Sequence, residues 1–586
     1  MEIEKTAATL QRKITSRLSL KAISFSREQQ ILAALVMIGA VLRLLLLGYK
    51  SIWLDEAFSL TISQRSLVDV LRMAVRADTH PPLYYIILKF WMGLGQGEAP
   101  VRLLSALFSI ASIPVMYKLA TSLYRDRRFG LLGAAILTFS PFQVWYAQEA
   151  RMYAMLTFFV LLSATYLFQA LQSRRRNDWI GYSIATLLAL YTDNGAIWYV
   201  IMISVFYLIS IKRFPGSLKD WFLANAGIGL LYLPWLPFLW MQTRQVTSLS
   251  WLPPPSFQAL LETFLDFHSY KFPYKEISLL YMALIFVWAY IVPKREWQLR
   301  LASLWLFLPL AISLLLSLRQ PIFLSRNLIA ASLGYYLLVA GTIWRFRSTK
   351  ATLALLLPLV AMNLVSIGYN TWVEQKEDWR AVAQYVAQSA RDNLGGLVVF
   401  LPRYTELPFQ YYFQRTNVSV DTQGYPGDEV LLHPEPKQVE DIAKMLEDRP
   451  YVWLVVRDTE TDHPDPSVKE WLDTHGYIRQ KDLVREDITV LMYVRWDKAT
   501  TVRLPKEPPK ESPTEFKMYA PTVSRGIEVL VYVIKPGETL LEIAVRYGTT
   551  VQYLMELNDL KDPDQITVGQ ELLIPKKTQG GTSTTP

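Results

Sequence analysis

Long apolar runs separated by short polar segments fill the first two thirds of the chain. A helix needs about 20 mostly apolar residues to cross the hydrocarbon core of a bilayer. We therefore expect a polytopic α-helical membrane protein with roughly eleven transmembrane helices. The apolar runs that predict them lie near 31–48, 100–124, 129–147, 152–172, 179–192, 194–211, 221–241, 277–293, 299–318, 327–344 and 351–368.

One shorter apolar run, 82–95, follows His80-Pro81-Pro82. It is too short to cross a bilayer comfortably, so we interpret it as an interfacial or re-entrant helix. Counting it as a span would invert the orientation of every later segment.

From about residue 370 the pattern changes to short helical and strand periods. Helical periods cover 378–390, 439–447 and 466–475, and strand periods cover 397–401, 451–456 and 490–494. Alternating helices and strands predict a small α/β domain. No glycine-rich phosphate loop follows any of these strands, so the pattern gives no reason to expect a nucleotide.

The remaining C-terminal segments differ in composition. A Pro/Lys/Glu-rich stretch is expected to be an extended linker, and a compact module with a strand–helix–helix–strand pattern follows it. The expected division is a basic N-terminus 1–30, a transmembrane domain 31–369, an α/β domain 370–498, a linker 499–528, a module 529–576 and a flexible tail 577–586.

Composition supports this division. The 586 residues are 52% hydrophobic with a mean hydropathy of +0.18, which is too apolar for one soluble domain. There is no cysteine, which excludes disulfides and thiolate metal sites. The net charge of +9 comes from short basic clusters between apolar runs. This distribution of basic residues reflects the orientation of the chain in a membrane, and it argues against a nucleic-acid partner.

Loop charge predicts the orientation. The N-terminal 30 residues lack the apolar core of a signal peptide. If they are cytoplasmic, and 82–95 does not span, every strong basic cluster also falls on the cytoplasmic side, as the positive-inside rule requires. We thus expect a cell-membrane protein whose C-terminal domains are extracytoplasmic. The cytoplasmic clusters are 125–128, 174–176, 212–213, 294–295 and 345–350.

Two adjacent carboxylates, Asp55 and Glu56, follow the first apolar run and are flanked by Trp53, Leu54 and Phe58. Carboxylates at the end of a membrane helix are costly and often functional. We expect Asp55 to act on a substrate at the outer face. The side chain of Glu56 points in a different direction from that of Asp55, whether this segment forms a helix or a strand. A supporting role for Glu56 therefore stays open.

Four motifs resemble the GT-C membrane glycosyltransferases, in the glycosyltransferase family 39-like branch that includes protein O-mannosyltransferases and the bacterial aminoarabinose transferase. They occur in the family's order, and each lies at an expected outer loop. The motifs are Asp55-Glu56, Asp78-Thr-His-Pro-Pro-Leu-Tyr84, Tyr146-Ala-Gln-Glu-Ala-Arg-Met-Tyr153 and Ser325-Arg-Asn-Leu328.

The resemblance implies a polyprenyl-phosphate sugar donor and an acceptor reached from outside. Asp55 matches the catalytic carboxylate and Glu149 the second acidic position, although Glu149 could instead pair with Arg102 or Arg151. His80 stands where some relatives have a lysine, and Arg326 where a lipid-phosphate arginine is expected, with Arg319 as its alternative. The residues that we expect to bind substrate are Glu56, His80, Arg151, Tyr153 and Arg326.

Such a donor already carries its leaving group. The reaction needs a base for the acceptor hydroxyl and cations for the departing phosphate. Asp55 is the expected base, and its attack opposite to the phosphate predicts inversion. Arg151, Arg326 and His80 are the candidate phosphate partners. No motif demands a cofactor; a divalent metal is left open, with His268 as the candidate ligand beside Asp266.

The C-terminal module resembles a LysM domain from Tyr532 to Pro575, including Tyr547-Gly548 and Val568-Gly569-Gln570. The resemblance implies binding to N-acetylglucosamine glycans such as peptidoglycan, which suits an extracytoplasmic C-terminus. The candidate glycan-binding residues are Gly537, Thr539, Leu540, Asn558 and Gly569.

Two other functions compete with a tethered glycosyltransferase. A transporter or flippase of a lipid-linked glycan would need charged residues at mid-span and paired repeats. A non-catalytic anchor that binds the cell wall would explain the LysM-like module, but would leave the outer carboxylates without a role.

Overall fold

The computed structural model describes most of the chain up to residue 498 and part of the C-terminal module. The described residues are 26–76, 80–245, 255–291, 296–319, 321–425, 439–447, 449–459, 464–498, 504, 529–534, 543, 554–555, 558, 560 and 570–575. Asp78, the cluster 294–295, most of the linker and the tail lie outside them. The chain forms two compact units, Met1–Lys510 and Glu511–Pro586.

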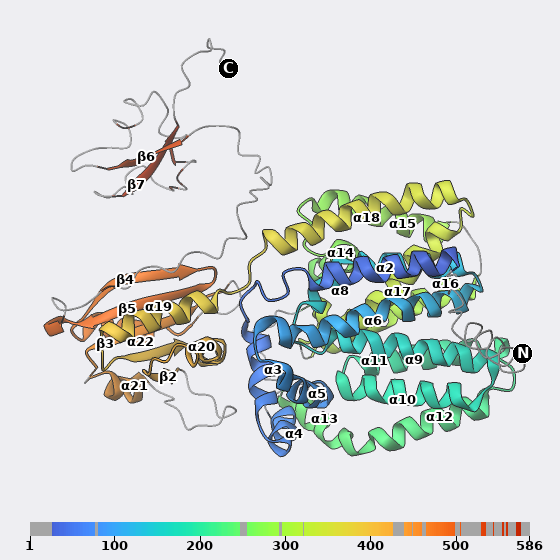
Figure 1. Ribbon diagram of the computed structural model, residues 1–586, viewed down its shortest axis with the longest axis horizontal. Helices are drawn as coiled ribbons and strands as arrows, with labels where there is room; N and C mark the ends of the chain where they lie inside the picture. Colours follow the sequence, from blue (N-terminus) through green and yellow to red (C-terminus); the bar gives the residue numbers. More distant parts are fainter. Residues whose placement is uncertain are drawn as a thin grey trace, which may run out of the picture. The chain divides into compact units, whose positions relative to one another are not determined.

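Helices make up the first part of the larger unit and run side by side in Figure 1. A helix or a broken pair of helices lies over every apolar run that we expected to span. The helices are α2 Arg27–Leu44, α3 Leu54–Gln64, α4 Leu67–Arg76, α5 Leu83–Trp91, α6 Glu98–Tyr124, α7 Arg127–Thr138, α8 Pro141–Ala147, α9 Tyr153–Ser173, α10 Arg176–Thr192, α11 Ala196–Ile209, α12 Leu218–Tyr232, α13 Leu236–Gln245, α14 Phe257–Ser269, α15 Lys275–Ile291, α16 Trp297–Ser317, α17 Ile329–Trp344 and α18 Thr349–Trp372.

Six of the described helices, counting α12–α13 as one, are long and apolar enough to cross a membrane, or seven if the bent pair α7–α8 is one span. This is fewer than the expected eleven, because helices such as α11 have only 14 residues. The run 82–95 forms a short apolar helix, α5 with the turn after it. Helices α3, α4 and α14, which join the longer helices, were not predicted.

The bend between α7 and α8 has a local cause. Ser140 caps α8 and Pro141 is its first residue, and proline cannot donate a main-chain hydrogen bond to the preceding turn. The buried Arg43 of α2 donates to the main-chain oxygens of Leu137 and Thr138 at 3.0 and 3.1 Å. Arg43 thereby supplies donors to two carbonyl groups at the bend, where Pro141 has no N–H to donate to Leu137.

The α/β domain contains a five-stranded mixed sheet in the order β2-β1-β3-β5-β4. Strand β1 pairs in parallel with β2 and β3, whereas β5 pairs antiparallel with β3 and β4. All residues of β1 are buried, as expected for a central strand covered on both faces. Its elements are α19 Trp379–Asp392, β1 Leu397–Leu401, α20 Glu406–Phe413, β2 Asp421–Gly424, α21 Val439–Leu446, β3 Tyr451–Arg457, α22 Ser467–Thr474, β4 Tyr477–Arg485 and β5 Ile488–Arg495.

Contacts from the α/β domain fix the segment that leads into α3. The main-chain nitrogen of Ile52 donates to the Tyr412 hydroxyl at 2.7 Å. The main-chain nitrogen of Arg380 donates to Ser51 Oγ at 3.2 Å, and its guanidinium pairs with Glu98 at 2.8 Å. The domain therefore helps to position the residues that precede Asp55.

In the smaller unit, β6 Val529–Val533 pairs antiparallel with β7 Glu571–Pro575. Both strands of the expected strand–helix–helix–strand module are present. The segments that we expected to form its two helices lie largely outside the described residues. Ile543 and Leu554 pack with Ile534, Leu572 and Ile574 in a small core.

Candidate active site

Asp55 and Glu56 both lie in the first turn of α3. Adjacent residues on a helix are about 100° apart around the axis, so their side chains enter different surroundings. Asp55 Oδ2 lies 3.3 Å from Arg326 Nη1, and the two side chains are 22% and 24% exposed. Two of the expected site residues, far apart in sequence, thus form one accessible ion pair. The pair belongs to Arg326 and not to Arg319, the alternative, which is exposed after the end of α16.

Glu56 lies in a different environment from Asp55. Its carboxylate is 0% exposed and receives hydrogen bonds from Arg102 Nε and Nη2, both at 2.7 Å, and from the main-chain nitrogen of Ala150 at 2.9 Å. Burial alone would raise the pKa of Glu56, but Arg102 and Lys376 lower it to about 2. We expected Glu56 to bind substrate; its carboxylate is instead enclosed and saturated by protein donors.

The pair of Glu56 and Arg102 organises the segment before α3. Arg102 also donates to the main-chain oxygens of Leu47, Lys50 and Ser51 at 2.8–3.0 Å. A buried guanidinium that bonds both to a carboxylate and to three carbonyl groups fixes the chain around it.

Glu149 lies in the turn between α8 and α9 and is also buried, at 1% exposure. Its Oε1 is 3.1 Å from Lys376 Nζ, which lies 3.7 Å from Glu56 Oε2 as well. Burial raises the pKa of Glu149, and Lys376 opposes the shift. The partner of Glu149 is therefore Lys376, and not Arg102 or Arg151 as considered from the sequence. Sequence reasoning did not identify Lys376, which is 227 positions from Glu149.

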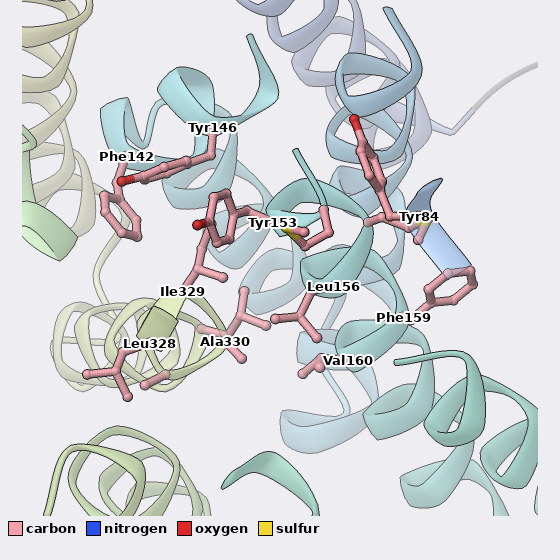
Figure 2. Packing of buried hydrophobic residues seen from close by; sticks show 14 of the residues in the cluster. Tyr84, Phe142, Tyr146, Tyr153, Leu156, Phe159, Val160, Leu328, Ile329 and Ala330 are labelled. Carbon is pink, nitrogen blue, oxygen red and sulfur yellow. The ribbon is translucent and has the colours of Figure 1, made fainter. Parts of the chain in front are cut away.

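Arg151 and Tyr153 lie close to the Asp55 region. Arg151 Nη1 is 3.1 Å from Ser59 Oγ and 3.4 Å from the main-chain oxygen of Asp55. Tyr153 packs against Tyr146, with ring centroids 5.0 Å apart. In Figure 2 the Tyr153 ring lies between the Tyr146 ring and Ile329, which is the first residue of α17, the helix that follows Arg326. Arg151 and Tyr153 thus connect α9 to the surroundings of Asp55 and Arg326.

His80 contacts a different carboxylate. Its Nε2 lies 3.5 Å from Asp193 Oδ2, at the junction of α10 and α11. The other oxygen of Asp193 accepts a hydrogen bond from the main-chain nitrogen of Gly195 at 2.6 Å. Among the described residues, His80 makes no ion pair with Asp55 or Glu149.

His268, the candidate metal ligand, is buried among aromatic rings. Its Nδ1 is 2.6 Å from the Tyr335 hydroxyl, and its ring stacks on Tyr281. In the part of the chain that the structure describes, no group of three or more His, Cys, Asp or Glu side chains could hold a metal ion. The structure therefore does not bring His268 into a ligand set with Glu149 or Asp55.

In the C-terminal module, Asn558 has an internal role. Its side-chain amide exchanges two hydrogen bonds with the main chain of Leu573 in β7, at 2.6 and 2.8 Å, and donates to the main-chain oxygen of Leu554 at 2.8 Å. These bonds tie the segment before Asn558 to the sheet. The other candidate glycan-binding residues, Gly537, Thr539, Leu540 and Gly569, lie outside the described residues.

Comparison with known structures identifies the fold of the larger unit. The protein resembles ArnT from Cupriavidus metallidurans in the apo state, with a TM-score of 0.54 and 14% identity over 81% of this chain and 99% of that one. The same protein bound to undecaprenyl phosphate gives a TM-score of 0.53 at 14% identity over the same shares. The Archaeoglobus fulgidus oligosaccharyltransferase gives 0.50 at 11% identity, over 74% of this chain and 70% of that one. The class is therefore that of multi-pass membrane proteins with a GT-C-like fold.

Family models add two domain assignments. Residues 79–240 match the dolichyl-phosphate-mannose-protein mannosyltransferase family, and residues 532–575 match the LysM domain. The chain therefore carries a glycosyltransferase domain of the first family and a C-terminal LysM domain, as the sequence predicts. The mannosyltransferase match includes His80, Glu149, Arg151 and Tyr153, whereas Asp55 and Arg326 lie beyond its ends.

Curated relatives match smaller parts of the chain. An uncharacterized protein of Aquifex aeolicus is 25% identical over 197 residues, which are 30% of this chain and 39% of that protein. Two Bacillus subtilis proteins match short stretches: the cortical fragment-lytic enzyme is 44% identical over 45 residues, and N-acetylmuramoyl-L-alanine amidase XlyA is 49% identical over 43. These are 8% and 7% of this chain, and 10% and 14% of the two proteins. The chain thus covers well under half of each relative.

Proposed function

We propose that the protein transfers a sugar from a polyprenyl-phosphate donor to an acceptor outside the cell membrane, with inversion at the anomeric carbon. The N-terminus is cytoplasmic, roughly eleven helices span the membrane, and residues 370–586 are extracytoplasmic. Support comes from the glycosyltransferase domain and from the fold shared with ArnT, whose structure contains undecaprenyl phosphate. The orientation is supported by loop charge, because this arrangement puts every strong basic cluster on the cytoplasmic side.

Asp55 acts as the general base in this proposal. It accepts the proton of the acceptor hydroxyl while that oxygen attacks the anomeric carbon and the polyprenyl phosphate leaves on the opposite side. The observation that carries the assignment is accessibility. Of the three acidic candidates, Asp55 is 22% exposed, whereas Glu56 and Glu149 are 0% and 1% exposed.

Arg326 and Arg151 bind the leaving phosphate. A guanidinium presents paired donors that match phosphate oxygens. Arg326 forms the ion pair with Asp55 described above, so the proposed base and a phosphate-binding cation belong to one site. Arg151 donates to Ser59 and to the main-chain oxygen of Asp55, on the same side of α3. Tyr153 forms part of the wall, and Glu149 and Glu56 support the site from within the protein.

The LysM domain tethers the enzyme to peptidoglycan or another N-acetylglucosamine glycan. Support for this role is the LysM match over residues 532–575. Tethering keeps the enzyme close to the cell wall through a high effective concentration.

Replacing Asp55 with Asn tests the proposal. The purified protein is incubated with a panel of labelled polyprenyl-phosphate sugars, mannose among them, and released polyprenyl phosphate is measured. Asp55→Asn is expected to lower the rate by about 10²–10⁴-fold, the usual contribution of a general base. Asp69→Asn is the matched control, because Asp69 pairs with Arg72 at 3.2 Å on the exposed face of α4. Wild-type rates in Asp55→Asn would exclude Asp55 as the base.

A further inference from the structure

Three lysines surround one tryptophan beside the buried carboxylates. The ammonium nitrogens of Lys50, Lys271 and Lys376 lie 4.6, 4.8 and 5.2 Å from the ring centre of Trp145. Lys50 precedes α3, Lys271 follows α14 and Lys376 follows α18, so three separate segments bring them together. We call Lys50, Lys271 and Lys376 the lysine cluster.

Like charges at this spacing repel one another, and partial burial increases the repulsion. Two of the lysines have carboxylate partners: Lys271 contacts Glu374, and Lys376 contacts Glu149 and Glu56. The ammonium group of Lys50 instead contacts a main-chain oxygen, that of Asn370. Among the described residues, no carboxylate lies within ion-pair distance of Lys50.

The charge on Lys50 is therefore poorly compensated. Burial, and then the nearby charges of Lys376, Lys271 and Arg102, lower the pKa of Lys50 to about 7, although Glu374 opposes the shift. A small pocket next to it is lined by Lys50, Trp145, Gln148 and Lys376, among others, but not by Lys271. An anion held by the three ammonium groups would reduce the repulsion between them.

The cluster is separate from the cations assigned to the leaving phosphate. Arg326 and Arg151 lie on the Asp55 side of α3. The lysine cluster lies on the side of Glu56 and Glu149, which Lys376 contacts directly. If the proposed function holds, the donor phosphate is already bound elsewhere, and the cluster is left for the second substrate.

We infer that Lys50 and Lys271, supported by Lys376, bind an anionic group of the acceptor, and that the acceptor is a glycan bearing phosphate or carboxylate groups. A glycan is favoured over a lipid because the same chain carries a LysM domain. That the bound anion belongs to the acceptor rests on the proposed function. The anion site itself does not depend on that function.

Acylation of lysines by limiting acetic anhydride, mapped by mass spectrometry on the full chain in detergent, tests the anion site without any turnover. An amine with a pKa of about 7 is largely unprotonated just above neutral pH, so Lys50 is expected to react faster than Lys212. N-acetylglucosamine 6-phosphate, at ten times its Kd, is expected to slow the reaction of Lys50 about tenfold. Neutral N-acetylglucosamine at equal ionic strength is expected to have no effect.

Matched variants and ligands make the result decisive. Lys271→Gln is expected to weaken protection of Lys50, whereas Lys118→Gln is expected to leave it intact, because Lys118 lies alone over Tyr166 at 5.7 Å. Asp55→Asn is expected to keep the protection, which separates this test from that of the base. Equal protection by chloride would overturn the anion site. Protection by polyprenyl phosphate but not by the sugar phosphate would assign the site to a lipid and overturn the glycan acceptor.

Discussion

Two neighbouring regions of α3 show how burial separates residues that the sequence presents as a pair. Asp55 meets Arg326 in an ion pair that is about a quarter exposed, while Glu56 is enclosed with Arg102, Lys376 and Glu149. An exposed pair is weak and can be rearranged by a ligand. A buried, saturated pair is rigid, and breaking it leaves an uncompensated charge. We therefore assign chemistry to the first region and support to the second.

The largest expected effect on stability comes from the buried region. Glu56→Gln leaves the guanidinium of Arg102 without its carboxylate, and breaking a buried ion pair typically costs about 3–5 kcal/mol. Denaturant unfolding in detergent is expected to show a loss of this size. Asp69→Asn, in an exposed ion pair, is the control and should lower stability by about 0–1 kcal/mol. Equal losses in both variants would contradict the contrast between the regions.

The pH dependence of stability should reflect the same carboxylate. The pKa of Glu56 is lowered in the folded protein from 4.5 to about 2. A lowered pKa contributes stability that is complete above pH 4.5 and is lost as the pH falls toward 2, here about 3 kcal/mol. Unfolding of the wild type between about pH 5 and pH 2 should show this loss, and Glu56→Gln should remove it. An identical acid slope in both proteins would refute the low pKa.

Smaller effects are expected at Lys376. Lys376→Met removes the ammonium group that Glu149 and Glu56 share. This loss should lower the free energy of unfolding by about 1–3 kcal/mol. Glu149→Gln should partly rescue it, because the raised pKa of Glu149 shows that its charge is unfavourable when buried. A double-mutant cycle measures this, with coupling of about 0.5–3 kcal/mol. Additive losses would mean that Lys376 and Glu149 act independently.

Removal of the LysM domain should affect the rate of donor cleavage less than any of the substitutions above. A chain that ends at residue 498 keeps every residue of the candidate active site. It is expected to cleave donor at the wild-type rate but to lose retention on sedimented peptidoglycan. Unchanged retention would contradict the tether.

The sequence predicted the helices and strands better than it predicted the contacts between side chains. Apolar runs reveal helices because their pattern is continuous, and β1 was predicted with its observed bounds because all five residues are buried. Strands β2 and β4 were missed because they are polar edge strands, at the two ends of the sheet order. Asp55 and Arg326 were identified from motifs. Lys376 and Lys50 had no motif, and only the folded chain brings them to Trp145.

The most direct test of this account compares Asp55→Asn with Glu56→Gln in one experiment that measures both donor cleavage and unfolding. Asp55→Asn is predicted to lose about 10²–10⁴-fold in rate while its stability stays within about 1 kcal/mol of the wild type. Glu56→Gln is predicted to lose about 3–5 kcal/mol of stability and to regain most of its rate at temperatures where it is folded. The reverse result, an active Asp55→Asn and a stable but inactive Glu56→Gln, would contradict the assignment of the two carboxylates.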